Sequence, residues 1–151
     1  MIELRDTVAD ELATFCEMDR DADTREHITL YSLKEHQREF ERADIVYLSI
    51  YAASKLAGYF ILALDPDSRS VEFRRIVVSA KGSGIGQAAI AAMETYCIER
   101  LQRQRIWLDV FESNSRGRHI YQKLGYRQCD NAESDGRNLL LMQKHLGAGV
   151  P

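Results

Sequence analysis

The stretch VVSAKGSGIGQAAIAAME, residues 77–94, joins a β-branched run to an alanine-rich helical pattern through three glycines in five positions. A strand that leads through a glycine loop into a helix exposes unpaired main-chain N–H groups, with the positive end of the helix dipole behind them. Such a junction is a natural anion site, and phosphate is its usual occupant. Lys81, Ser83 and Gln87 add side-chain donors. We therefore favour a ligand site over a tight turn that merely needs positive φ angles.

Two well-known phosphate motifs do not fit this loop. A nucleotide P-loop needs four residues between its glycines and then Gly-Lys followed by Ser or Thr, whereas Gly86 is followed by Gln87 and Ala88. A dinucleotide fingerprint needs the spacing G-x-G-x-x-G, which fails when it is counted from Gly82 or from Gly84. That fingerprint also belongs early in a doubly wound sheet, not after an antiparallel meander. The anion is therefore expected to belong to another kind of ligand.

Composition limits the class of protein. The 151 residues, 45% hydrophobic and 28% charged, indicate one soluble domain spanning residues 1–151. A formal net charge of −3 argues against nucleic acid as the main partner. Three distant cysteines and four histidines without ligand spacing predict reduced thiols and no metal site. The first ten residues carry acidic side chains where a signal peptide needs Lys or Arg. The longest apolar run, residues 57–64, is too short to span a bilayer, so we expect a cytoplasmic protein.

Alternation and periodicity predict a strand, a helical region, three strands, a helix, a strand, a helix and two final strands. The strands are expected at 2–5, 45–51, 56–64, 71–78, 105–111, 126–129 and 139–144, and the clearest helices at 8–19, 87–103 and 113–124. Residues 19–44 are charged and ambiguous, with Leu30, Leu33 and Phe40 as expected core contacts. Residues 130–138 are expected to form a polar loop.

The order of these elements indicates the fold class. The three strands between 45 and 78 are expected to form an antiparallel meander. The last of them, the glycine loop, the next helix and the strand at 105–111 form a βαβ unit, which makes its two strands parallel. The class is therefore α+β, with a mixed, mostly antiparallel central sheet flanked by helices.

Two blocks of sequence resemble the GCN5-related N-acetyltransferase (GNAT) family. Residues 81–86, KGSGIG, look like its (Gln/Arg)-x-x-Gly-x-(Gly/Ala) signature, with Lys81 in the Gln/Arg place. Residues 107–127, WLDVFESNSRGRHIYQKLGYR, are similar to a second family block that requires an asparagine, a tyrosine, a glycine and an aromatic residue, here Asn114, Tyr121, Gly125 and Tyr126. Gly117 replaces the commoner alanine, which we expect to be harmless. The two ends of the chain also resemble the family, whereas residues 19–44 do not.

The resemblance implies an acyl-CoA N-acyltransferase fold and acetyl-CoA as cosubstrate. The main-chain amides of residues 82–87 would hold the pyrophosphate, and the strand at 71–78 would pair with the pantetheine arm where it splays from the strand at 105–111. Asn114 would bond to the pantetheine amides, cap the following helix, or do both. The expected cofactor-binding residues are Ile76, Val77, Val78, Lys81, Gly82, Ser83, Gly84, Ile85, Gly86, Gln87, Asn114, Tyr121 and Lys123.

Acetyl transfer to an amine requires a polarised thioester carbonyl and a proton donor for the leaving thiolate. A main-chain N–H near Val77 or Val78 is the candidate for the carbonyl. Tyr121 is the candidate acid, because a phenol with a pKa of ~10 holds its proton more tightly than a thiol with a pKa of ~8.5. It lies two helical turns after Asn114, so both side chains can face one groove. The alternative for Tyr121 is a core tyrosine beneath the sheet.

The amine must also lose a proton, and two carboxylates are candidate bases. Asp109 lies five residues before Asn114, where ribosomal-protein acetyltransferases of this family carry a proposed glutamate base. Glu72 is interpreted as lying on the same strand face as Ile76 and Val78, an arrangement that other members use. Structural or solvated carboxylates, or a water relay without a dedicated base, are the alternatives.

The sequence thus predicts an N-acetyltransferase that moves an acetyl group from acetyl-CoA to a primary amine of a small molecule or protein by direct attack. The alternative is a noncatalytic acyl-CoA-binding regulatory module. No nucleic-acid or membrane partner is expected, and a homodimer is possible. The acceptor depends on residues 19–44 and 130–138, where no chemistry can be identified. The acidic residues 17–23 are interpreted as a solvated helix end, or as an attraction for a cationic amine.

Overall fold

Seven strands form one sheet in the computed structural model, which describes residues 1–25, 27–79 and 84–147. The spatial order is β1-β2-β3-β4-β5-β7-β6. The strands are β1 (Ile2–Asp6), β2 (Ile45–Ala52), β3 (Lys55–Leu64), β4 (Ser70–Val78), β5 (Arg105–Phe111), β6 (Arg127–Ser134) and β7 (Arg137–His145). The β4–β5 pair is parallel and the other five pairs are antiparallel, which confirms the predicted fold class.

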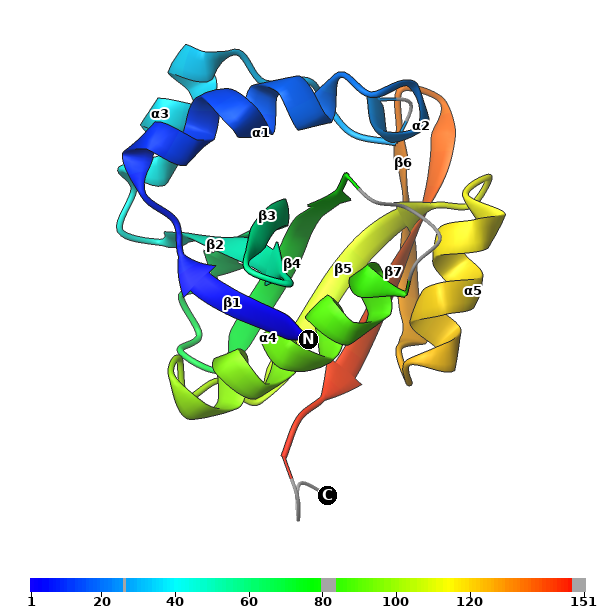
Figure 1. Cartoon of the computed structure of the whole chain (residues 1–151). Coiled ribbons are helices and arrows are strands. Elements are labelled where there is room, and N and C mark those ends of the chain that lie inside the picture. Colours follow the sequence, from blue (N-terminus) through cyan, green and yellow to red (C-terminus); the bar gives the residue numbers. More distant parts are fainter. Residues whose placement is uncertain (26, 80–83, 148–151) are drawn as a thin grey trace.

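Helices cover both faces of the sheet (Figure 1). One face carries a short 3₁₀ turn and three helices: η1 (Ala9–Glu11), α1 (Leu12–Asp19), α2 (Ala22–Arg25) and α3 (Leu33–Phe40). The other face carries α4 (Ile85–Glu99) and α5 (Ser115–Lys123). None of the helices that the structure describes is both long and apolar enough to span a bilayer.

Within the ambiguous region 19–44, a local signal marks the start of the helix α3. α3 begins with a capping box, in which the Ser32 hydroxyl accepts a hydrogen bond from the Glu35 N–H at 3.1 Å and Glu35 Oε1 accepts one from the Ser32 N–H at 2.9 Å. This pair satisfies two N–H groups that the helix itself leaves unpaired. Phe40 packs against the core as expected, whereas Leu30 and Leu33 are each 42% exposed, so their prediction as core residues was wrong.

Two apolar cores lie on the two faces of the sheet. Met93 and Cys97 of α4 pack with Phe60 of β3 and Leu108 of β5 on the α4–α5 face. On the opposite face, α1 contributes Leu12 and Phe15, which pack with strand residues that include Tyr47, Tyr59, Ile61 and Val77. The Phe15 ring stacks on Tyr59 with centroids 4.1 Å apart. The alternating side chains of the strands thus supply both cores, as expected for a sheet between two helical layers.

The polar loop expected at 130–138 is instead a tight β-hairpin. β6 and β7 pair as far as Ser134 and Arg137, and the turn between them consists of Asp135 and Gly136, with φ angles of 51° and 74°. Two successive positive φ angles match the twist of the strands, and Asp-Gly is a favoured pair for such a turn. The prediction failed because the polar residues of β6, whose side chains are nearly all exposed, do not alternate with apolar ones.

The register between β3 and β4 shifts at a β-bulge. Leu62 pairs with Phe73, but its neighbour Ile61 pairs with Arg75, so Arg74 is the extra residue. A bulge moves every following side chain of its strand to the opposite face. Val71 and Phe73 therefore share the α4–α5 face with Ile76 and Val78.

Gly58 on β3 permits a close approach to the end of β4. A Cβ atom at this position would lie 2.1 Å from the Val77 carbonyl oxygen and 3.0 Å from the Val78 Cα atom. Both of these atoms belong to the backbone and cannot rotate away. We expect Gly58→Ala to lower the free energy of unfolding by at least about 2 kcal/mol in urea titrations. Gly86→Ala is the control, because its new methyl group meets only Val78 Cγ2, at 4.0 Å. Equal stability of the two variants would contradict this prediction.

Candidate active site

The parallel strands β4 and β5 separate after three paired positions. Their register runs from Ser70 opposite Arg105 to Glu72 opposite Trp107, and no further pairs follow among the described residues. Beyond this point β4 stays paired with β3 as far as Val78 opposite Gly58, and β5 stays paired with β7 as far as Phe111. The predicted splay is therefore confirmed. A cavity of about 1120 Å³ opens between the diverging ends and is lined by residues of both strands.

The beginning of α4 forms one side of this cavity. Gly84 precedes the helix with a φ angle of 78°, which favours glycine, and the first helical hydrogen bond runs from the Ala88 N–H to the Gly84 carbonyl at 3.2 Å. The N–H groups of Ile85, Gly86 and Gln87 come before that bond and have no partner within the helix. All three residues line the cavity. The helix therefore presents to the cavity donors that it does not satisfy itself, together with the positive end of its dipole.

The beginning of α5 forms a second part of the wall. Asn114 caps the helix, and its Oδ1 accepts a hydrogen bond from the Gly117 N–H at 3.0 Å. A Cβ atom on residue 117 would lie 2.7 Å from Asn114 Nδ2. Alanine at this position would therefore require the Asn114 amide to move, whereas Gly117 accommodates the cap as it stands. That Gly117 is a harmless replacement stays a prediction. The Nδ2 atom has no hydrogen-bond partner among the described residues, and Asn114 lines the cavity.

Tyr121 reaches the cavity from α5. Its ring packs edge-on against Phe73 and Tyr126, with centroids 5.9 and 6.0 Å away. Burial, and to a lesser extent the negative charge of Asp109, raise the pKa of Tyr121 to about 12. None of the described residues forms a hydrogen bond with its hydroxyl group. The phenol is therefore protonated at neutral pH and free to donate.

Glu72 and Asp109 line the cavity from the opposite face of the sheet. Each alternates along its strand with residues of the α4–α5 core, so both carboxylates point toward the α1–α3 side. Glu72 is held by Arg74 at 2.9 Å. The Asp109 side chain is exposed to the cavity, which it lines together with Glu72. Desolvation, followed by the negative charge of Glu72, raises the pKa of Asp109, and the nearby Arg74 lowers it by less.

The sequence model of the acetyltransferase (GNAT) family matches residues 9–126. The chain belongs to this family. Acetyl-CoA is therefore its cosubstrate, and transfer of the acetyl group to an amine is its reaction.

Solved structures of other acetyltransferases share this fold at low sequence identity. A spermidine N-acetyltransferase from Vibrio cholerae, in complex with CoA and spermine, superimposes with a TM-score of 0.81 at 17% identity over 95% of both chains. An aminoglycoside acetyltransferase in complex with coenzyme A superimposes with a TM-score of 0.82 at 14% identity, over 96% of this chain and 95% of that chain. At such identities the likeness concerns the fold alone.

Most of the residues that the sequence predicts for the acetyltransferase site line the one cavity. These are Glu72, Ile76, Val77, Val78, Gly84, Ile85, Gly86, Gln87, Asp109, Asn114 and Tyr121. Lys81, Gly82 and Ser83 lie outside the described residues. Lys123 is exposed at the end of α5 and is not part of the cavity wall, so the structure does not support its prediction as a cofactor-binding residue.

The predicted orientation of Glu72 was wrong. Strict alternation along β4 would place its side chain on the same face as Ile76 and Val78. The bulge at Arg74 inserts one residue between them, so Glu72 faces the same side as Arg75 and Val77. The carboxylate therefore lies on the face opposite to Tyr121. No sequence signal marks this bulge, because an arginine can occupy a regular position of a strand as well as a bulge.

Sequence reasoning assigned the acceptor to residues 19–44 and 130–138 but identified no individual residue of one wall of the cavity. Residues 27–29 and Tyr31, together with Asp23 and Thr24, line it from the α1–α3 side, and Asp135 lines it from the tip of the β6–β7 hairpin. Arg75 also lines it. The Asp-Gly pair at 135–136 was a readable turn signal, but nothing local indicates that residues 23–31 fold over the end of β4.

Asp109→Asn should stabilise the acetyltransferase at neutral pH. Burial and the charge of Glu72 raise the pKa of the Asp109 carboxyl in the folded state. Such a group favours folding at a pH below ~3.9, the pKa that it has in the unfolded chain. This contribution is lost as the pH rises through the pKa that the group has in the folded state. The neutral amide removes the penalty that the ionised form pays at pH 7. We expect a higher Tm at pH 7 and a difference that shrinks as the pH approaches ~4. A lower Tm at pH 7 would show that Asp109 stabilises the fold.

Proposed function

We propose that the enzyme transfers the acetyl group directly to a cationic primary amine, with CoA bound between the ends of β4 and β5 and the amine entering from the α1–α3 side. One observation carries this proposal: a single cavity is lined by the amide-bearing turn of α4, by Tyr121 and by two carboxylates on the opposite face of the sheet. Direct attack requires a donor, an acid and a base around one reaction centre. The gap in the sheet gives all three access to the same space.

The first turn of α4 is suited to the pyrophosphate of the cofactor. The N–H groups of Ile85, Gly86 and Gln87, which have no partner within the helix, form a favourable anion site at its start. Lys81, Gly82 and Ser83 precede this turn in the sequence and are proposed to extend the site. Because main-chain groups make these contacts, glycine matters more here than the identity of a side chain. The Nδ2 group of Asn114 is proposed to donate to a pantetheine carbonyl.

Val78 is the better candidate for polarising the thioester carbonyl. The Ser79 N–H donates to the Ala57 carbonyl at 2.8 Å, so it points toward β3. Because successive N–H groups of a strand point in opposite directions, the Val77 N–H also points toward β3, whereas those of Ile76 and Val78 point toward the gap. A donor fixed beside the gap stabilises the oxyanion that develops on the carbonyl oxygen. This geometry supports Val78 over Val77.

Tyr121 is proposed to stabilise the leaving sulfur. Its pKa of about 12 lies well above the ~8.5 of a thiol, so complete proton transfer to the thiolate is unfavourable. A hydrogen bond from the phenol to the sulfur requires no such transfer, and it strengthens as negative charge develops there. We therefore assign Tyr121 the role of hydrogen-bond donor in the transition state. The thiolate then takes its proton from solvent.

Asp109 is the better candidate base of the two carboxylates. Glu72 is engaged by Arg74, which also lies 3.4 Å from Glu39. Asp109 has no hydrogen-bond or ion-pair partner among the described residues, and its raised pKa makes it a stronger base than an ordinary aspartate. Either carboxylate would attract an ammonium group before reaction.

The proposed reaction conserves atoms and charge as follows. The ammonium group first releases one proton to water, which leaves a neutral amine with a lone pair. That lone pair forms the N–C bond, and the carbonyl electrons move to the oxygen near the Val78 N–H. The nitrogen becomes much more acidic at this stage and releases its extra proton to Asp109, directly or through water. The carbonyl then re-forms, the C–S bond breaks, and its electron pair leaves on sulfur beside Tyr121. The Vibrio cholerae spermidine N-acetyltransferase, solved with CoA and spermine, supports a cationic amine as the kind of acceptor.

Calorimetric titration with acetyl-CoA, followed by thiol-release assays with a panel of amines, tests this proposal. The panel should include spermidine, spermine, an aminoglycoside and a lysine peptide. We expect saturable binding of acetyl-CoA and release of CoA thiol that depends on a cationic amine. Binding without release for every amine would favour the noncatalytic acyl-CoA-binding module. Absence of binding would refute the site itself.

Tyr121→Phe should separate catalysis from binding. Loss of one transition-state hydrogen bond is expected to lower kcat about 100-fold, while the Kd for acetyl-CoA changes less than about 3-fold. Tyr96→Phe is the matched control, because Tyr96 is a partly buried tyrosine of α4 outside the cavity. An unchanged kcat in Tyr121→Phe would eliminate this tyrosine from the chemical step.

A further inference from the structure

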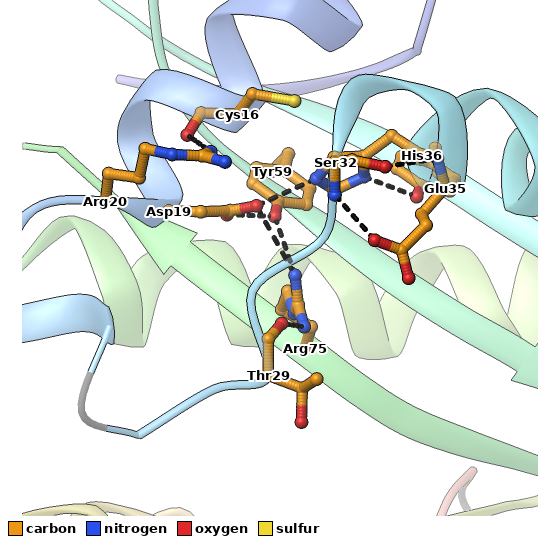
Figure 2. Close-up of polar contacts among 10 residues, drawn as sticks. Cys16, Asp19, Arg20, Thr29, Ser32, Glu35, His36, Tyr59 and Arg75 are labelled. Atoms are coloured by element: carbon orange, nitrogen blue, oxygen red, sulfur yellow. Dashed lines mark hydrogen bonds and ion pairs between the residues drawn. The ribbon is translucent and has the colours of Figure 1, made fainter.

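A buried polar network lies behind the α1–α3 wall of the cavity. Asp19 at the end of α1 and His36 in α3 are both fully buried, and Arg75 on β4 is only 7% exposed. Figure 2 shows the Asp19 carboxylate between His36, Tyr59 and Arg75. The sequence gave no reason to expect this, because the acidic residues 17–23 are typical of a solvated helix end.

The network satisfies its members by hydrogen bonds. Asp19 Oδ2 lies 2.8 Å from His36 Nε2 and 3.4 Å from the Arg75 guanidinium, and Oδ1 accepts from the Tyr59 hydroxyl. His36 Nδ1 lies 2.7 Å from the Tyr47 hydroxyl. A neutral imidazole that donates from Nε2 to Asp19 and accepts at Nδ1 from Tyr47 satisfies every contact. Asp19 then neutralises Arg75, and the buried cluster carries no net charge.

Arg75 also connects this network to the cavity wall. Its second guanidinium nitrogen donates to the main-chain carbonyl of Thr29, and the guanidinium lies over the Tyr31 ring, 4.3 Å from the centroid. The segment between α2 and α3 has no helix or strand at residues 27–32. The conformation of such a segment depends on contacts of this kind rather than on a regular hydrogen-bond ladder. Arg75, Thr29 and Tyr31 all line the cavity.

Stability alone is a poor explanation for this arrangement. Replacing a buried ion pair by apolar side chains of similar volume is often neutral or stabilising. An apolar side chain at position 75, however, would leave the Thr29 carbonyl without its donor and the Tyr31 ring without its cation. A guanidinium supplies both contacts at once because it is planar and carries several donors. Its neutralisation by Asp19 also limits its repulsion of a cationic amine in the cavity.

We propose that Arg75 is a positioning residue that shapes the acceptor end of the cavity and thereby sets which amines the enzyme accepts. It holds the wall at residues 27–31 through Thr29 and Tyr31, and Asp19 with His36 and Tyr59 holds Arg75. This inference rests on the proposed function, since it assigns the α1–α3 side of the cavity to the amine. Arg75 acts through the wall and is not a catalytic residue.

Arg75→Met and Arg75→Lys, measured with the amine panel, test the proposal. For Arg75→Met we expect the KM of the best amine to rise at least about 10-fold and the ranking of the amines to change, with the Kd for acetyl-CoA within about 2-fold. Hydrogen exchange of a peptide covering residues 27–32 should accelerate about 10-fold or more. Arg75→Lys keeps the charge opposite Asp19 but cannot make the same set of contacts, so a smaller change in the same direction is expected.

Arg103→Met is the matched control. Arg103 also donates to main-chain carbonyls, those of Asp65 at 2.9 Å and Ser70 at 3.3 Å, but all three residues lie outside the cavity wall. This variant should lose stability while the KM of the amine and the ranking of the panel stay within about 2-fold. The same change of ranking in Arg103→Met would show that loss of stability, rather than the wall, causes the effect.

Each outcome decides the proposal. An unchanged amine KM and unchanged exchange at residues 27–32 in the Arg75 variants would overturn it, as would a fall in kcat alone. If Arg75→Met does not fold, Arg75→Lys decides by the same readouts. If the unaltered protein acetylates no amine, the proposed function fails, and the exchange experiment still shows whether Arg75 holds the wall.

Discussion

The separation of β4 from β5 is the constraint on which the site depends. Each strand keeps its other partner, so β4 remains paired with β3 and β5 remains paired with β7 while the two move apart. One edge of each strand end therefore lacks a neighbouring strand. Main-chain groups without partners need water or a ligand when they are removed from solvent. An extended ligand with amide groups, such as the pantetheine arm, can supply those partners along the edge of β4.

The same gap brings together groups from opposite faces of the sheet. Tyr121 approaches from the α5 side and Asp109 from the α1–α3 side, yet the charge of the carboxylate contributes to the raised pKa of the phenol. In a closed sheet a layer of backbone would separate them. The β-bulge at Arg74 completes this division, since it directs Ile76 and Val78 to one face and Arg75 to the other. Cofactor and acceptor can thus reach one reaction centre from different sides.

The two faces of the sheet are built differently, and the difference matches their proposed tasks. The α4–α5 face has an apolar core that includes Phe60, Met93 and Leu108. The α1–α3 face combines stacked aromatic rings with the buried Asp19–Arg75 pair. An apolar core tolerates many packings, whereas a hydrogen-bonded cluster requires specific partners in specific places. The polar network therefore suits a wall whose shape must be defined without regular secondary structure.

Local patterns in the sequence determined most of the strands, the principal helices and the glycine that precedes α4. They succeeded because alternation, helical period and capping depend on residues that are close in the chain. The asparagine that caps α5 and the tyrosine two turns later were found for the same reason, and their resemblance to a family block indicated the chemistry. The acidic helix end at 17–23 and the polar run of β6 misled, because their local composition resembles that of solvated segments.

Only the tertiary structure decided the rest. The bulge at Arg74 follows from the register of β4 against β3, and the burial of Asp19 follows from its contacts with Tyr59 and Arg75, 40 and 56 residues away. The wall at residues 27–31 likewise contacts an arginine of a distant strand, Arg75. Such features arise from pairings between remote segments, and a register or an ion pair of this kind leaves no periodic trace in the neighbouring sequence.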